Sequence, residues 1–340
     1  MRKALAISVP SLVVSMLVHV AAAQAQSSVS VTLTPDGQAY ATSQGATAQT
    51  FSDDIQKRIN DAYSASNVNG FLRGFADAAS FSNRGLGVDY ASLPNHAIVG
   101  VGATVSAVSD GIPSRERPVG GVAANFAVMA ALNLGTFDLP RWTVSAHGLY
   151  YKASSDELRG AVTGAGAHLQ YKLFKPREGL SATLLLWNGL DLTAGVEFLR
   201  WGLGATQTIS TDVVQNGQTL KLDSTGTFDL TTTTMTVPIE ATTGFRIALL
   251  ATVYAGAGID LQYGKTSVNA DLVGKLHTAD NSTELATATI KLDGSNSPHP
   301  LAPRALLGVQ LNLWKLKIYV QGTVNAIPAA SLGAGVRLVL

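Results

Sequence analysis

An all-β fold, an antiparallel up-and-down transmembrane β-barrel of about ten strands, is predicted by three features of the sequence. Apolar and polar residues alternate in a series of segments, which gives each strand one face that suits lipid. Charged residues make up only 14% of the chain, yet no stretch after residue 25 is apolar over the roughly 20 residues that a membrane helix needs. The last eleven residues form another alternating strand, as closure of a barrel requires.

The first 25 residues have the form of a secretory signal peptide. Arg2 and Lys3 precede an apolar run over residues 4–20, and the run leads into the small-residue sequence Ala23-Gln24-Ala25. A membrane anchor is the alternative, but Pro10 interrupts the run, which is short for a bilayer. We therefore expect a cleaved signal peptide over 1–25.

Composition excludes several kinds of protein. The chain has no cysteine, which excludes a bacterial lipoprotein, a disulfide framework and a thiolate metal site. Loss of the two cationic residues of the leader changes the formal net charge from +1 to −1. Such a charge gives no field that would attract nucleic acid.

Ten segments show the same alternation of apolar and polar residues and are the expected transmembrane strands. In each, aliphatic and aromatic residues occupy every second position and polar or small residues lie between them. Twelve strands are the alternative, if parts of the long connections also cross the bilayer. The ten apolar files cover residues 99–105, 122–134, 142–150, 165–173, 190–198, 237–249, 253–261, 305–313, 318–324 and 332–340.

The connections support this count because long and short ones mostly alternate, as they do in bacterial barrels with short periplasmic turns. This parity places both ends of the barrel, over residues 95–340, in the periplasm. The two longest connections, 202–236 and 264–303, are expected to be extracellular hairpins. Asn216-Gly217 is a strong two-residue turn signal within the first of them.

The N-terminal segment, residues 26–94, differs in kind from the barrel. A short alternating piece is followed by a turn at Pro35-Asp36-Gly37, a helix with Ser52 as its N-cap, and a second amphipathic helix from Val68. Three interpretations of this pair of helices stay open: a plug inside the lumen, a periplasmic cap, or a helix on the membrane surface. Residues on the apolar face of the second helix, the candidate plug contacts, are Phe71, Leu72 and Phe75.

Inward-facing residues allow two interpretations of the lumen. Glycine pairs on four strands (residues 100 and 102, 164 and 166, 256 and 258, 333 and 335) leave room for a plug or let a small barrel bend. The inward charges either pair with one another or line a narrow polar channel. The candidate lumen residues are His147, His168, Lys172, Asp191, Glu197, Glu240, Arg246, Asp260, Arg304, Lys317 and Arg337.

No pattern indicates catalysis. Ser145 and His147 share an inward face near His168, but no acidic residue on the same strands orients either imidazole, so a hydrolase is disfavoured. A zinc site from the two histidines and Glu197 is equally weak. The Gly-x-Gly pairs do not open a helix after a strand and are not nucleotide fingerprints. We predict no enzyme, no cofactor and no metal.

With its leader, alternating strands and terminal strand, the chain resembles bacterial outer-membrane β-barrel proteins over residues 97–340. It departs from their pattern at Leu340, where an aromatic residue is usual. The stretch 66–94, with Gly74-Phe75-Ala76, is faintly similar to the N-terminal segment of outer-membrane long-chain fatty-acid transporters. The run from Arg84 to Ala91 is similar to leptospiral-type surface antigens. The resemblance implies a Gram-negative outer-membrane location, with outer-membrane lipid and the barrel-assembly machinery as partners.

Two functions are therefore carried forward. The first is a non-enzymatic surface protein, structural or adhesive, whose extracellular hairpins contact an unknown ligand. The second is a narrow, porin-like transport barrel for small or hydrophobic molecules, gated by the N-terminal segment.

Overall fold

The computed structural model of the chain describes residues 26–64, 68–92, 97–109, 119–181, 184–215, 218–280, 282–327 and 329–340. The predicted signal peptide, the centre of the turn at 216–217 and Asn281 lie outside these residues. Within the described part, no helix combines the length and apolar character that a membrane crossing needs.

Ten antiparallel strands form a closed ring, because the last strand pairs with the first from Ala329 opposite Val108 to Val339 opposite Ile98. The predicted fold class is confirmed, with ten ring strands rather than twelve. In order around the ring, the strands are β2 (Ala97–Ser109), β3 (Val119–Asn133), β4 (Trp142–Ser154), β5 (Leu158–Phe174), β7 (Leu185–Gln215), β8 (Gln218–Ile247), β9 (Ala251–Thr278), β11 (Leu301–Leu313), β12 (Leu316–Asn325) and β13 (Ala329–Val339).

The outer face of the ring is an apolar band. Val101, Leu307 and Leu332 are more than half exposed there, while their chain neighbours face inward. Aromatic side chains lie along the edges of the band. Trp142 packs against Tyr171 at one end of β4 and β5, with ring centroids 4.6 Å apart, and Tyr150 and Tyr151 lie exposed further along β4. Aromatic belts of this kind mark the two interfaces of a bilayer.

The two ends of the ring differ. One end carries short connections, including the 3-10 helix η1 (Leu134–Phe137), the hairpin of β6 (Arg177–Ser181) with β7, and the turns at 248–250 and 314–315. We call it the short-turn end. The C-terminal residue Leu340 lies there, because its amide donates to the carbonyl of Ala97 at the start of β2 (2.8 Å).

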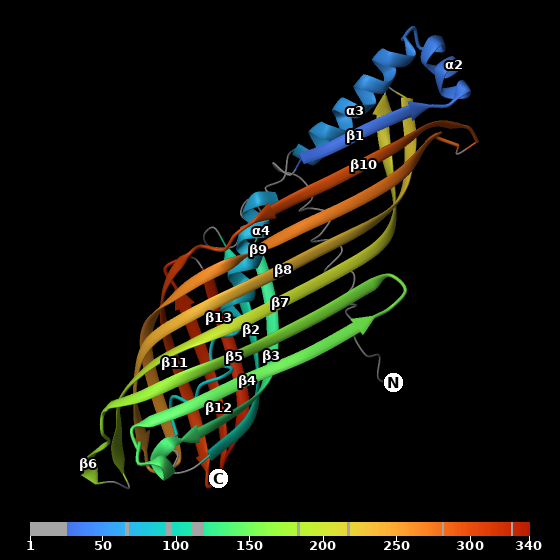
Figure 1. Ribbon diagram of the computed structural model, residues 1–340. Helices are drawn as coiled ribbons and strands as arrows, with labels where there is room; N and C mark the ends of the chain where they lie inside the picture. Colours follow the sequence, from blue (N-terminus) through green and yellow to red (C-terminus); the bar gives the residue numbers. More distant parts are fainter. Residues whose placement is uncertain are drawn as a thin grey trace.

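At the opposite end, β7, β8 and β9 continue beyond their neighbours as one sheet (Figure 1). The lower part of β9 pairs with β11, from Ala251 to Leu261, whereas its upper part from Thr266 pairs with β10 (Glu284–Asn296). β10 in turn pairs with β1 (Gln26–Leu33). We call this extension, with the helices that cover it, the head. The predicted hairpins at 202–236 and 264–303 are thus strand extensions.

The helices of the N-terminal segment are α2 (Pro35–Ser43), α3 (Ala48–Ser64) and α4 (Val68–Phe81). The expected turn at Pro35-Asp36-Gly37 is wrong: these residues begin α2, because the Thr34 hydroxyl accepts the Gly37 amide and caps the helix. Ser52 is not an N-cap either. Thr47 accepts the Thr50 amide one turn earlier (3.1 Å), and the Ser52 hydroxyl donates to the Val31 carbonyl (3.2 Å).

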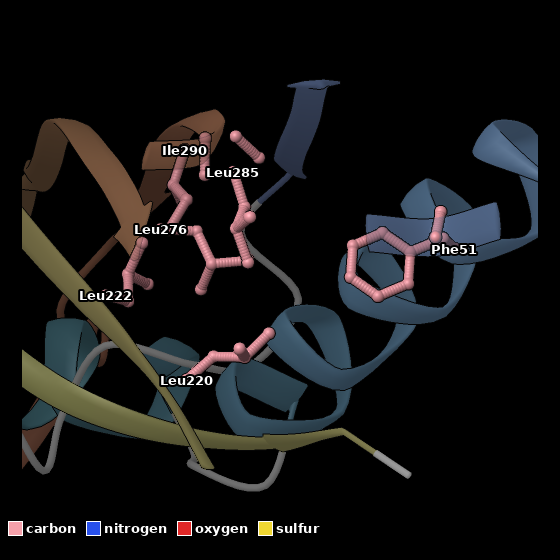
Figure 2. Close-up of a cluster of buried hydrophobic side chains, with 9 residues drawn as sticks. Phe51, Leu220, Leu222, Leu276, Leu285 and Ile290 are labelled. Atoms are coloured by element: carbon pink, nitrogen blue, oxygen red, sulfur yellow. The ribbon is translucent and has the colours of Figure 1, made fainter. Parts of the chain in front are cut away.

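The head has its own apolar core between α2, α3 and the strands. Phe51 of α3 points toward leucine and isoleucine side chains of β8, β9 and β10 and is almost fully buried (Figure 2). Tyr40 of α2 meets Phe51 edge to face, with ring centroids 5.9 Å apart. The labelled strand residues in this core are Leu220, Leu222, Leu276 and Ile290, with Leu285 at the start of β10.

Phe51→Ala is therefore expected to loosen α3 from the head. Loss of a buried phenylalanine costs about 3–5 kcal/mol, and this cost falls on the docking of the N-terminal segment. Trypsin should cut after the exposed Lys57 much faster in this variant, whereas Gln49→Ala, on the exposed side of α3, should leave the rate unchanged. Equal cleavage rates in the two variants would contradict this role of Phe51.

Candidate functional site in the barrel lumen

The eleven candidate lumen residues all come from ring strands, and the structure places their side chains on the inward face. Eight of them are buried, while Lys172, Arg246 and Lys317 are partly exposed. They do not form one cluster. Lys172 pairs with Asp191 (2.8 Å) near the short-turn end, and Lys317 donates to the carbonyl of Trp314 (2.6 Å).

A cluster of buried charges in the lumen is organised by Arg84, which follows α4 and was not among the candidates. Its guanidinium contacts both oxygens of Glu197 on β7 (2.9 and 2.8 Å) and Oδ2 of Asp260 on β9 (3.1 Å). Arg304 on β11 binds Asp260 through its Nε (2.9 Å) and also binds Glu240 on β8. Two arginines therefore pair with three carboxylates, which gives these five groups a formal charge of −1, and all five side chains are almost fully buried.

A second ion pair joins the N-terminal segment to the closing strand of the ring. Arg337 on β13 is fully buried and contacts Asp89 (3.1 Å), donates to the carbonyl of Val88 (2.7 Å), and lies 3.7 Å from the centre of the Tyr319 ring. Asp89 also accepts the amides of Ala91 and Ser92 (3.0 and 2.9 Å). These bonds fix residues 88–92 against the wall.

Gly85 and Gly87 lie so close to the barrel wall that a side chain at either position would collide with it. Gly85 has a φ of +82°, and a Cβ at this position would lie 2.7 Å from the amide of Gln321 on β12. A Cβ at Gly87 would lie 2.1 Å from His147 Nδ1 and 3.0 Å from the His168 ring. The backbone from Arg84 to Val88 thus lies directly on inward wall residues.

The two inward histidines lie next to each other in the lumen. Their rings stack with centroids 5.6 Å apart, and His168 Nε2 binds Glu197 (3.0 Å), the same carboxylate that holds Arg84. Neither nitrogen of His147 has a hydrogen-bond partner among the described residues. Within those residues, no three His, Asp or Glu side chains are grouped as ligands for a metal ion.

Helix α4 lies within the ring at the end where the head begins (Figure 1). Leu72 and Phe75 pack in an apolar cluster with Leu230 and Val268, and Phe71 contacts the same cluster from a partly buried position. Phe75 meets Trp201 of β7 edge to face at 6.0 Å. The three candidate plug contacts thus lie against β7, β8 and β9 at the level where these strands pass from the ring into the head.

Asp77 ties α4 to the linker between β10 and β11. The buried carboxylate accepts the amide of His299 (2.8 Å) and binds its Nδ1 (2.6 Å). Burial raises the pKa of Asp77, although the bonds from His299 oppose this shift. The Asp77 carboxylate is thus buried, and its hydrogen-bond partner outside α4 is His299.

Asp77→Ala is expected to destabilise the docking of α4 by about 1–3 kcal/mol, because the bonds to the His299 amide and ring are lost. Hydrogen exchange of the α4 amides should become faster. Asp229→Ala is the matched control: Asp229 pairs with Arg159 at 3.4 Å, but both side chains are more than half exposed, so its loss should have little effect. Unchanged exchange in α4 of the Asp77 variant would contradict the assignment.

Comparisons with known proteins give one family and a set of distant structures. The Lsa36-like family model, which describes leptospiral surface antigens, matches residues 22–340. The predicted similarity to leptospiral-type surface antigens is therefore confirmed. No curated protein matches. Similar solved structures include the translocator domain of autotransporter NalP from Neisseria meningitidis (12% identity, 86% of this chain and 97% of that chain covered, TM-score 0.32) and the attachment invasion locus protein Ail of Yersinia pestis (12%, 72% and 98%, 0.24). The toluene transporter TodX of Pseudomonas putida also matches (11%, 78% and 98%, 0.26).

Proposed function

The chain belongs to the Lsa36-like family, and from this premise we propose that it is a non-enzymatic surface protein of the bacterial outer membrane, a plugged barrel that presents the head outside the cell. The observation that carries the proposal is the lumen segment around Arg84 and Asp89, which is ion-paired to strands on several sides of the ring. Pulling the segment away would leave buried charges without their partners, which is costly, so the pairs hold the segment in the lumen.

The orientation follows from the two ends of the ring. In bacterial barrels short turns face the periplasm and long connections face outward, which puts the head at the cell surface. The apolar band and its aromatic edges would contact outer-membrane lipid, and the barrel-assembly machinery would insert the chain. The signal peptide would be removed on export.

The outward sheet face of the head is the proposed contact surface for a structural or adhesive role. It is polar and carries exposed charges of both signs on β9 and β10, including Lys275, Asp271 and Lys291. Lys275 pairs with Glu284 (2.8 Å) and Lys291 lies 4.0 Å from Asp271, yet Lys275, Lys291 and Asp271 are each at least 60% exposed. Exposed charges of both signs can complement the charge pattern of a macromolecular partner.

Single-channel recording of the full mature chain in planar bilayers tests the plugged state. We expect no unitary conductance steps at either voltage polarity, because the segment that blocks the lumen is held by ion pairs. Steady unitary steps from the unmodified chain would contradict the proposal and favour the alternative, a narrow transport barrel gated by the N-terminal segment.

Adhesion is tested with wells coated with extracellular-matrix extract. The mature protein in detergent should bind, and Lys265→Glu with Lys275→Glu and Lys291→Glu on the head should reduce binding. Lys175→Glu with Arg177→Glu and Lys315→Glu, all exposed at the short-turn end, is the matched control with three charge reversals and should bind normally. Equal binding by both variants would show that the head face is not the contact surface.

A further inference from the structure

The N-terminal segment runs through the barrel from one end to the other. β1 lies in the head, paired with β10 from Gln26 opposite Asp293 to Leu33 opposite Ala286. α4 and residues 82–92 then follow the lumen, and β2 begins at Ala97 beside the C-terminal residue at the short-turn end. The mature N-terminus and the start of the barrel are thus on opposite sides of the apolar band.

The N-terminal segment completes the head rather than merely resting on it. The Thr34 amide donates to the Leu285 carbonyl (3.0 Å), and α2 packs so closely that a Cβ on Gly37 would lie 1.8 Å from the same carbonyl oxygen. Ala41 and Phe51 are buried in a core to which strands β8 to β10 contribute leucine, isoleucine and alanine side chains. The folded form of residues 26–64 therefore depends on a sheet that stands beyond the membrane band.

The lumen is too narrow to admit this segment in its folded form. Ten strands are near the size at which side chains alone fill a barrel, and here inward residues already contact the backbone at Gly85 and Gly87. An extended chain is far thinner than two helices and a strand. The leading part also has little charge to desolvate, since Asp36 is the only charged residue between Gln26 and Ser52.

We propose that this barrel carries its own N-terminal segment across the outer membrane. Residues 26–64 pass through the lumen unfolded, in contact with the ring as it forms, and fold on the β10 edge once outside. Burial of the apolar face around Phe51 and pairing of β1 would draw the segment outward. Arg84 and Asp89 then pair with the wall and hold the trailing part in the lumen. The proposal rests on the outward orientation of the head.

Location is tested with single cysteines, for which the chain provides a clean background because it has none. Ser28→Cys lies on β1, Thr225→Cys on the head part of β8, and Thr136→Cys in the 3-10 helix at the short-turn end, all at exposed positions. A membrane-impermeant maleimide on intact cells should label the first two, and Thr136→Cys only after lysis. Labelling of Thr225→Cys without Ser28→Cys would overturn this inference alone, whereas failure to label Thr225→Cys would overturn the proposed function as well.

The route is tested by fusing a small, fast-folding domain between the signal peptide and Gln26 in the Ser28→Cys chain. A folded domain cannot enter the ring, so labelling of Ser28→Cys on intact cells should be lost while labelling of Thr225→Cys in a parallel fusion persists. The same domain with a core substitution that keeps it unfolded should restore labelling at Ser28→Cys. Undiminished labelling with the folded domain would show that the segment does not travel through the lumen.

Discussion

Replacing Arg84 with alanine is expected to lower the free energy of unfolding by about 3–5 kcal/mol, because it leaves Glu197 and part of Asp260 buried without their cation. Arg84 contacts both carboxylates within 3.1 Å and is almost fully buried. The loss should also free residues 82–92 from the wall. Urea unfolding of the protein in detergent micelles measures the first effect, and the appearance of brief conductance steps in planar bilayers measures the second.

Arg159→Ala provides the control for Arg84→Ala, since it removes the same side chain from an exposed pair with Asp229. Its effect should stay below about 1 kcal/mol. A second variant separates loss of charge from loss of packing: Arg84→Met with Glu197→Gln removes one buried charge of each sign and should be more stable than Arg84→Ala. If Arg84→Ala were as stable as Arg159→Ala, the ion pairs would not hold the segment in the lumen.

Gly121→Val is expected to force α4 away from β3. A Cβ at Gly121 would lie 2.4 Å from the backbone of Gly74 and Phe75 in α4, and neither the helix backbone nor the closed ring can give way cheaply. Overpacking of this kind costs about 1–3 kcal/mol and sometimes more. We expect lower stability in urea, faster hydrogen exchange in α4, and conductance steps that the unmodified chain lacks.

Gly202→Val is the matched control for Gly121→Val. It makes the same substitution in a ring strand, but a Cβ there would meet no atom within 4 Å. Valine is also favoured over glycine in strands, so this variant should be neutral or slightly more stable. Similar losses in both variants would mean that valine perturbs the strands themselves and that α4 does not pack against Gly121.

The ring could be predicted from the sequence because its signal is local. Each lipid-facing row of apolar residues, such as the one through Leu307 and Val309, is visible within ten residues of sequence. The parity of the connections supports an even number of strands, but only the structure decides between ten and twelve. The sequence pattern predicts the cap of α3 at Ser52, but Thr47, five residues earlier, is also a hydroxyl residue that can cap a helix. Only the fold shows that Thr47 serves as the cap while Ser52 reaches the carbonyl of Val31.

The residues of the lumen site were predicted only in part. Arg84 was missed because its partners lie far away in the sequence. Glu197, Asp260 and Arg304 were candidates because their strands give them an inward direction. Arg84 lies in an irregular stretch without a period, so nothing in the sequence says which wall residues it will meet. The same limit applies to β1, a visible alternating piece whose partner, β10, lies more than 250 residues away.

The most direct test of the central claim, that the N-terminal segment fills the lumen of a ten-stranded barrel, is a crosslink between the two. Asn83 follows α4, and its side chain is hydrogen-bonded to that of Asn125 on the inward face of β3. With cysteines at both positions, oxidation or a short bis-maleimide should join them in nearly all of the folded protein, whereas Asn83→Cys with Thr136→Cys should stay unlinked. If both cysteines of the first pair remained free, and Asn83→Cys reacted with a soluble maleimide as fast as Thr136→Cys, the segment would not occupy the lumen.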